Sequence, residues 1–171
     1  RSGSIENLLR DTAIFALRGS NIIPEFDFEE ALWQSEFDEA QMGQVFNNLV
    51  LNARQAMHKG GVIKISASNM EGGSVMVPPV GDGRFVRITV ADSGEGIPEG
   101  HLPHIYDPYF TTKHKSSLHN GTGLGLFIVY QNMLDHQGTI EVESKVDGGT
   151  KFILALPTNL SNENKPSTES L

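Results

Sequence analysis

The sequence of 171 residues contains no cysteine, which excludes disulfide bonds and thiolate metal sites. It also lacks any run of about 18 consecutive apolar residues, the length that a membrane-spanning helix needs. No apolar stretch follows the polar residues 1–7, so we expect no signal peptide. These absences predict a cytoplasmic location without membrane insertion, although the parent protein can still be anchored by another segment.

Positive charge is scarce, with 13 lysines and arginines against 21 aspartates and glutamates, a formal net charge of −8. An acidic chain has no general field that attracts nucleic acid phosphates, so we expect no nucleic-acid partner. A polyanion would need a focused site, in which a metal ion or backbone N–H groups supply the positive charge.

The length suits a single domain, which we place at 1–157 with a core over about 21–157 and an N-terminal helix over about 4–18. The patterns predict helices and strands as follows: helices over 4–17, 38–57 and 123–136; strands over 21–28, 31–37, 62–68, 85–91, 139–144 and 150–156. The polar segment 158–171 is interpreted as a disordered tail or linker. The mixed order of elements favours an α+β class and a two-layer sandwich.

The helix predicted over 38–57 has two different faces. Its apolar side, which we expect to pack on the sheet, comprises Met42, Phe46, Leu49, Ala53 and Met57. The opposite stripe consists of uncharged amides: Gln41, Gln44, Asn48, Asn52 and Gln55. Solvent-facing helices normally carry charges, whereas amides suit a ligand that needs donors and acceptors, and an amide oxygen can bind Mg²⁺. The alternative is a polar face that contacts only solvent, or amides that form hydrogen bonds to a loop, and the helix alone does not decide between these possibilities.

The segment 90–97 is a second candidate site. Alternate residues of the strand before it share one face, and Asp92 continues that register on the inward side. A carboxylate there must find a donor, and an adenine amino group suits it. Gly94 and Gly96 let the backbone approach a flat ring. The alternative is a tight turn in which Asp92 caps its own amides.

A glycine-rich segment, Gly121-Thr122-Gly123-Leu124-Gly125-Leu126, opens the helix predicted over 123–136. Unobstructed N–H groups at the positive end of a helix make a phosphate cradle without lysine. It is not a Walker loop, because no Gly-Lys-Ser/Thr follows, and a polar loop precedes it where a Rossmann motif has a strand.

Residues 106–113 and 114–120 lie between these segments, and the second stretch, 114–120, suggests a lid over a bound nucleotide, with Lys113 reaching a terminal phosphate. An ordinary surface loop is the alternative. Tyr109 and Phe110 are more typical of a core than of a ligand site.

Four motifs in one order resemble the ATP-binding domain of histidine protein kinases, within the GHKL superfamily, over roughly 31–156. The N, G1, F and G2 boxes are matched by residues 44–53, 92–97, 107–113 and 121–126. Details around Ala56-Met57 and Thr111-Thr112-Lys113 resemble the nitrogen-regulation type of sensor kinase. The resemblance implies the Bergerat fold, with helices on one face of a mixed, mostly antiparallel sheet.

The resemblance also implies residue roles. Asn52 would bind Mg²⁺ with Asn48 assisting, and Asp92 would bind the adenine amino group of ATP. Thr150 would reach adenine through a water. The further nucleotide contacts are carried over as Gln55, Gly94, Gly96, Ile97, Lys113 and the 121–126 backbone, and the catalytic residues as Asn48 and Lys113.

Asn48 separates two classes of enzyme within the superfamily. GHKL ATPases carry glutamate at the matching position as a general base, and an amide cannot take a proton at neutral pH. We therefore expect slow hydrolysis and in-line transfer to a histidine. An ATPase and a catalytically inactive nucleotide-binding module remain the alternatives, the second because Gln55 and Ala56 stand where many sensor kinases have a basic residue.

The phosphoacceptor is missing, since none of the six histidines precedes an acidic residue, as the acceptor does in such kinases. The two-helix dimerisation region is missing as well. The expected partners are therefore ATP or ADP, a separate dimerisation and histidine-phosphotransfer domain of the parent kinase, and a response regulator. The isolated chain is expected to be a monomer.

Overall fold

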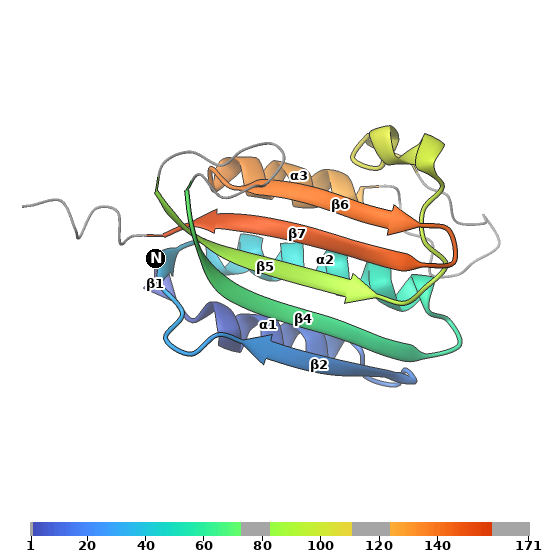
Figure 1. The fold of residues 1–171 in the computed structure, drawn as a ribbon, viewed down its shortest axis with the longest axis horizontal. Helices are drawn as coiled ribbons and strands as arrows, with labels where there is room; N and C mark the ends of the chain where they lie inside the picture. The colour runs from blue at the N-terminus through green and yellow to red at the C-terminus, as the bar shows by residue number, and fades with distance from the viewer. Residues whose placement is uncertain (1, 73–82, 111–123, 159–171) are drawn as a thin grey trace, which may run out of the picture.

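The computed structural model describes residues 2–72, 83–110 and 124–158. Within them, a five-stranded sheet has three α-helices packed on one face (Figure 1). The elements in chain order are β1 (Ser2–Gly3), α1 (Ile5–Ala16), β2 (Ile22–Phe28), β3 (Ser35–Glu36), α2 (Glu39–Ala56), β4 (Gly61–Glu71), β5 (Arg84–Asp92), the 3-10 helix η1 (Glu99–His104), α3 (Gly125–Asp135), β6 (Thr139–Lys145) and β7 (Gly149–Pro157).

The strand order in the sheet is β2-β4-β5-β7-β6. The pair β2 and β4 is parallel, and the pairs β4–β5, β5–β7 and β6–β7 are antiparallel. The expected α+β sandwich, with a mixed and mostly antiparallel sheet, is confirmed. The α2 helix lies between α1 and α3 behind the sheet, so it is the central helix of its layer (Figure 1).

The apolar face of α2 forms the centre of the core, as its periodicity predicts. Its five predicted core residues are between 0% and 5% exposed and join one cluster with the inward residues of the sheet. Asp38 caps the helix, because its carboxylate accepts a hydrogen bond of 2.9 Å from the Gln41 amide. This burial fixes which face of α2 is left to carry the amide stripe.

The α1 helix is packed into the same core. Ser4 caps its first turn, and its inward side chains are buried: Ile5, Leu9, Ala13, Ala16 and, just beyond the helix, Leu17. At its other end Arg54 of α2 donates through Nη1 to the carbonyls of Ala16, at 2.9 Å, and Arg18, at 3.0 Å. Arg54 thus ties the end of α1 to α2 and is not directed at the amide stripe.

Replacement of Arg54 by methionine should lower the free energy of unfolding by about 1–3 kcal/mol, because two carbonyls at a helix end lose a charged donor. Urea denaturation would measure the change. Arg18→Met is the matched control, since the Arg18 guanidinium lies over the ring of Phe15, which is 66% exposed. Equal shifts for both variants would contradict a specific capping role for Arg54.

The strand predicted over 31–37 is largely wrong. Only Ser35 and Glu36 are in a strand, which pairs with β1, and Ala31 adopts a positive φ of 56°. The side chain of Asn69 on β4 holds this segment as a loop, accepting from the Trp33 amide at 2.9 Å and donating to the Ala31 carbonyl at 3.2 Å. A side chain 36 residues away therefore overrides the local strand pattern.

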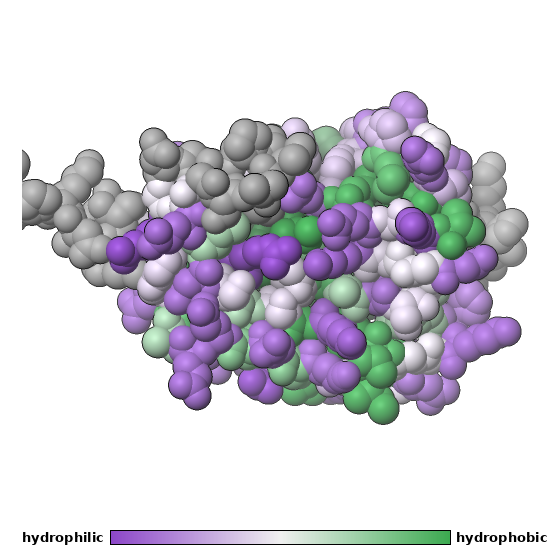
Figure 2. Space-filling view, viewed as in Figure 1, coloured by the Kyte–Doolittle hydropathy of each residue, from purple (hydrophilic) through white to green (hydrophobic). Residues whose placement is uncertain are grey.

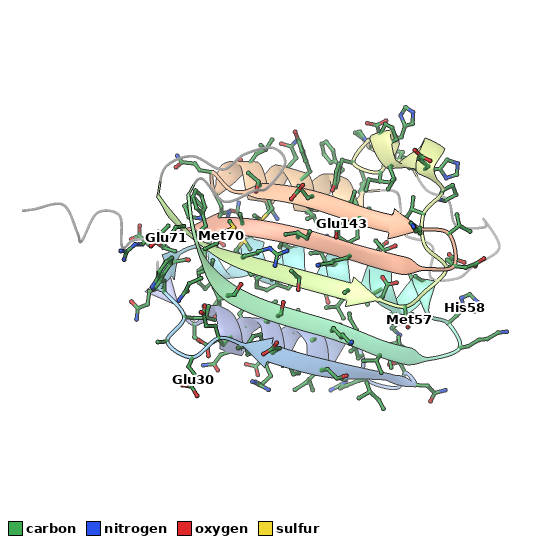
Figure 3. The ribbon with its side chains drawn as sticks, viewed as in Figure 1. Glu30, Met57, His58, Met70, Glu71 and Glu143 are labelled. Carbon is green, nitrogen blue, oxygen red and sulfur yellow. The ribbon has the colours of Figure 1, made fainter. Side chains whose placement is uncertain are left out.

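The opposite face of the sheet carries no helix of the described residues (Figure 1). Hydrophilic and hydrophobic residues are mixed across it (Figure 2). Met70 on β4 and Glu143 on β6 lie over this side (Figure 3). Met70 packs against a small separate cluster of Phe85, Ile153 and Ala155. In the described part of the chain, no helix is long and apolar enough to cross a membrane.

Candidate nucleotide site

The inward face of the sheet changes from apolar to polar at one end of β5, β7 and β6. The register aligns Val90 with Phe152 and Val142, and the next inward row aligns Asp92 with Thr150 and Ser144. Thr150 is 5% exposed, and Asp92 and Ser144 are half-buried. We call Asp92, Thr150 and Ser144 the polar row. It places a carboxylate and two hydroxyls together where the apolar core ends.

Asp92 is held by two backbone amides. Its Oδ1 accepts from Gly94 N at 2.8 Å and from Thr150 N at 3.2 Å. Burial raises the pKa of Asp92 above its ordinary value of 3.8, and these two hydrogen bonds lower it in part. Oδ2 has no hydrogen-bond partner among the described residues. The carboxylate is therefore oriented by the protein while one oxygen remains available to a ligand.

The loop after Asp92 is tied to the C-terminal end of α2. The Glu95 amide donates to the Ala56 carbonyl at 3.2 Å, and the Ser93 amide donates to Sδ of Met57 at 3.4 Å. Met57 and His58 lie at this end of the helix, close to the start of β4 (Figure 3). A Cβ at Gly94 would lie 2.5 Å from the Ala56 carbonyl oxygen, so glycine is required for this approach.

Gly96 and Gly149 join the same loop to the β6–β7 hairpin. Both have positive φ, 74° and 83°, and a Cβ would lie 1.8 Å from the Lys145 oxygen at Gly96 and 2.1 Å from the Asp92 oxygen at Gly149. The contacts of these glycines are therefore with protein backbone, a reason for glycine that the sequence pattern does not reveal. The Ile97 amide adds a hydrogen bond of 2.8 Å to Ser144 Oγ.

The amide stripe of α2 faces α3. Asn48 donates through Nδ2 to the Gly125 carbonyl at 3.2 Å. Asn132 of α3 donates to the backbone carbonyl of Gln41 at 3.3 Å and to the side-chain oxygen of Gln44, Oε1, at 3.4 Å. The stripe is thus divided: its first turns pair with α3 and serve packing, while Asn48 connects α2 to the beginning of α3. Asn52 and Gln55 follow on the same helix, are half-buried, and lie nearer the helix end that contacts the loop after Asp92.

The expected phosphate cradle is described only in part. Leu124, Gly125 and Leu126 lie at the N-terminal end of α3, where Leu124 provides no side-chain cap for the N–H groups of the first turn. An uncapped helix N-terminus suits an anion. Gly121, Thr122, Gly123 and Lys113 fall outside the described residues, as do the proposed lid over 114–120 and residues 159–171 of the polar tail.

The segment leading into the proposed lid contains one core residue and one exposed residue. Phe110 packs against the core, with ring centroids 5.6 Å from His101 and 6.0 Å from His104. Tyr109 is 74% exposed with a φ of 66°, so its interpretation as a core residue is wrong. Tyr106 stacks on Tyr130 of α3 at 5.3 Å, which anchors the segment to the helix.

The donor set suits Mg²⁺ only together with a ligand. No cluster of three His, Cys, Asp or Glu side chains that could hold a metal is present in the part of the chain that the structure describes. Asn48 uses its Nδ2 in the bond to Gly125, which orients its Oδ1 as the remaining polar atom. Mg²⁺ typically keeps one or two protein oxygens and completes its shell with phosphates and water, so amide oxygens fit a nucleotide-bound ion.

A model of the family described as histidine kinase-, DNA gyrase B-, and HSP90-like ATPase matches residues 37–160. The chain belongs to this family. It is 38% identical over 138 residues to the sensor histidine kinase ZraS of Escherichia coli K12, covering 81% of this chain and 26% of that protein. It is 39% identical over 120 residues to sporulation kinase A of Bacillus subtilis, covering 70% and 17% respectively. The chain thus spans a minor part of these relatives.

Solved structures of the family share the fold. The catalytic domain of histidine kinase ThkA superposes with a TM-score of 0.73 at 30% identity, covering 92% of this chain and 95% of that one. Full-length ShkA in complex with AMPPNP gives a TM-score of 0.74 at 25% identity, covering 92% and 30% respectively. The family assignment is confirmed, and the nitrogen-regulation subtype stays a prediction.

Sequence reasoning missed Ser144 and the contacts of Met57 with Ser93. A signal for Ser144 was present, because the hairpin predicted around residues 147–149 pairs Ser144 with Thr150 once its register is drawn. Met57 was expected only as a core residue. Its sulfur also accepts from the Ser93 amide and hydroxyl, a role that helical periodicity does not predict.

Proposed function

We propose that this chain is the catalytic domain of a two-component sensor histidine kinase, which binds Mg-ATP and donates the γ-phosphoryl group to a histidine on a separate domain. The observation that carries the proposal is the orientation of Asp92. Its carboxylate is held through one oxygen by two amides at the end of the apolar core, with the other oxygen left for the adenine amino group.

Two contacts along α2 are spaced to suit the two ends of a nucleotide. Its C-terminal end contacts the loop after Asp92 through Ala56, and Asn48 contacts the beginning of α3. Eight residues of helix separate them, about 12 Å at 1.5 Å per residue. A nucleotide lying along α2 can therefore place its base beside Asp92 and its phosphates beside Asn48, Asn52 and the N-terminus of α3.

The transfer step requires positioning and charge neutralisation. Mg²⁺, when bound with the nucleotide, neutralises charge that develops on the phosphates. Asn48 and Asn52 would orient the phosphates and the ion through their amide oxygens, and Asp92 would hold the base. Asn48 cannot act as a general base toward water, so the γ-phosphoryl group is kept for the acceptor histidine. The relatives named sensor kinases support a response regulator as the downstream partner.

Calorimetric titration tests the binding step. We expect ADP and a non-hydrolysable ATP analogue to bind this chain, and Asn52→Asp to change the affinity only when Mg²⁺ is present. Gln44→Asp is the matched control, since Gln44 lies on the same stripe but is exposed and pairs with Asn132. Absence of nucleotide binding, or an equal Mg²⁺-dependent effect of both variants, would contradict this assignment.

Phosphoryl transfer is tested by adding the dimerisation and histidine-phosphotransfer domain of a sensor kinase to this chain with labelled ATP. We expect acid-labile label on the acceptor histidine and slow steady-state hydrolysis by this chain alone. Rapid steady hydrolysis without the acceptor would favour the ATPase alternative. Tight nucleotide binding without transfer to any cognate acceptor would favour a nucleotide-binding module.

A further inference from the structure

Ser144 makes three hydrogen-bond contacts with one hydroxyl group. Its Oγ accepts from the Ile97 amide at 2.8 Å, lies 3.1 Å from the Gly149 carbonyl oxygen and lies 2.8 Å from Thr150 Oγ1. These contacts join β6 to the loop after Asp92 and to the first residues of β7. Nothing in the expected nucleotide contacts assigns a role to this residue.

A single arrangement of the two hydroxyl protons satisfies all three contacts. A hydroxyl has one proton to donate and two lone pairs that accept. The Gly149 carbonyl can only accept, so the Ser144 proton points to it. The Ile97 amide occupies one lone pair of Ser144. The contact with Thr150 is then a hydrogen bond only if Thr150 donates its proton to the second lone pair of Ser144.

Thr150 is left with lone pairs alone on the side away from Ser144. Its neighbour in the polar row is Asp92, whose Oδ1 already accepts from two amides and whose Oδ2 is likewise an acceptor. The row therefore presents acceptors only. A ligand edge in direct contact with the row must supply N–H donors, and a base with an oxygen in direct contact meets unpaired lone pairs.

We propose that Ser144 is a positioning residue for base selection: its Oγ accepts the hydrogen bond of the Thr150 hydroxyl, and the site so favours a 6-aminopurine over a 6-oxopurine. The inference rests on the proposed nucleotide site and adds to it the residue that decides whether the Thr150 hydroxyl donates or accepts toward the base. Without the Ser144 hydroxyl, the Thr150 hydroxyl is free to donate a hydrogen bond to a 6-oxo group. Base selection, and not affinity alone, should therefore depend on residue 144.

The test compares ADP with inosine diphosphate, which differs by a 6-oxo group, in calorimetric titrations of the complete 171-residue chain. We expect Ser144→Ala to reduce the preference for ADP by about tenfold, the scale of one hydrogen bond to a buried polar group. Ser144→Thr should restore the preference because it returns the hydroxyl. Thr150→Val combined with Ser144→Ala should lower the ratio no further than Thr150→Val does, because the two residues act through one hydroxyl.

Ser66→Ala is the matched control, because Ser66 forms the same kind of hydroxyl pair with Thr89 on the opposite face of the sheet. It should leave the ratio unchanged. Equal losses of ADP and inosine diphosphate affinity in Ser144→Ala would overturn the inference and leave the nucleotide site intact. Lack of discrimination by the unaltered chain would overturn it as well, and lack of ADP binding would overturn the proposed function itself.

Discussion

Asp92→Asn should weaken ADP binding by about 10- to 100-fold, because the base loses a charged acceptor and faces an amide donor in its place. The same variant should raise the melting temperature of the nucleotide-free chain. The asparagine oxygen can still accept from Gly94 N and Thr150 N, while the buried charge is gone. Calorimetric titration and thermal unfolding at pH 7 measure the two opposite effects.

The sign of the stability change follows from the pKa of Asp92, which burial raises above 3.8. The folded chain holds this proton more tightly than the unfolded chain does. The resulting contribution to stability is fully present below pH 3.8 and is lost as pH rises through the folded pKa. At pH 7 the ionised carboxylate therefore opposes folding, and its removal stabilises the chain.

A pH series provides the control on the binding effect. ADP affinity of the unaltered chain should fall as pH decreases, beginning above the range of an ordinary aspartate, while the residual affinity of Asp92→Asn should lack that phase. A lower melting temperature for the variant would contradict the assignment of burial as the dominant influence on this carboxylate. Unchanged ADP affinity would contradict its role in binding the base.

Gly96→Ala should destabilise the chain by about 3 kcal/mol or more and abolish nucleotide binding. The added Cβ would lie 1.8 Å from the Lys145 oxygen, and the loop would have to leave the β6–β7 hairpin to make room. That movement also breaks the hydrogen bond of the Asp147 amide to the Glu95 carbonyl, at 2.8 Å. Urea denaturation and ADP titration measure the two consequences.

Gly19→Ala is the control that separates the effect of the close backbone contact at Gly96 from the effect of its left-handed backbone conformation. Gly19 has a φ of 77°, nearly the 74° of Gly96, but nothing lies within 4 Å of the position that a Cβ would take there. The substitution should cost about 1 kcal/mol, the cost of a left-handed conformation alone, and leave ADP binding unchanged. A similar loss in both variants would show that conformation and not the backbone contact makes glycine necessary at 96.

Local patterns predicted the elements that bury a clear face. The α2 helix runs from Glu39 to Ala56 against a prediction of 38–57, and the β6–β7 hairpin lies where its glycine turn indicated. Pairing over long sequence separations was not predictable. The parallel contact of β2 with β4 and the capture of residues 31–33 by Asn69 depend on distant partners, which periodicity does not contain.

The site was predictable where the alternation of a single strand decided which way a side chain faces. Asp92 follows the inward residues of β5, so its location could be derived from alternation alone. The reasons for its surrounding glycines could not, because they depend on three backbones meeting: Ala56 of α2, Lys145 at the end of β6, and Asp92 itself. Contacts of that kind exist only in the folded chain.

The position of β7 has a consequence for synthesis. It is the last strand in chain order among the described residues, yet it lies inside the sheet between β5 and β6 and contributes Thr150 to the polar row (Figure 1). A nascent chain emerges from its N-terminal end, so it can form α1, α2 and the β2–β4–β5 part of the sheet first. The hydrogen bond between Thr150 N and Asp92 cannot form until the β6–β7 hairpin has been released. Complete orientation of Asp92, on which the proposed base recognition depends, therefore waits until the β6–β7 hairpin has left the ribosome.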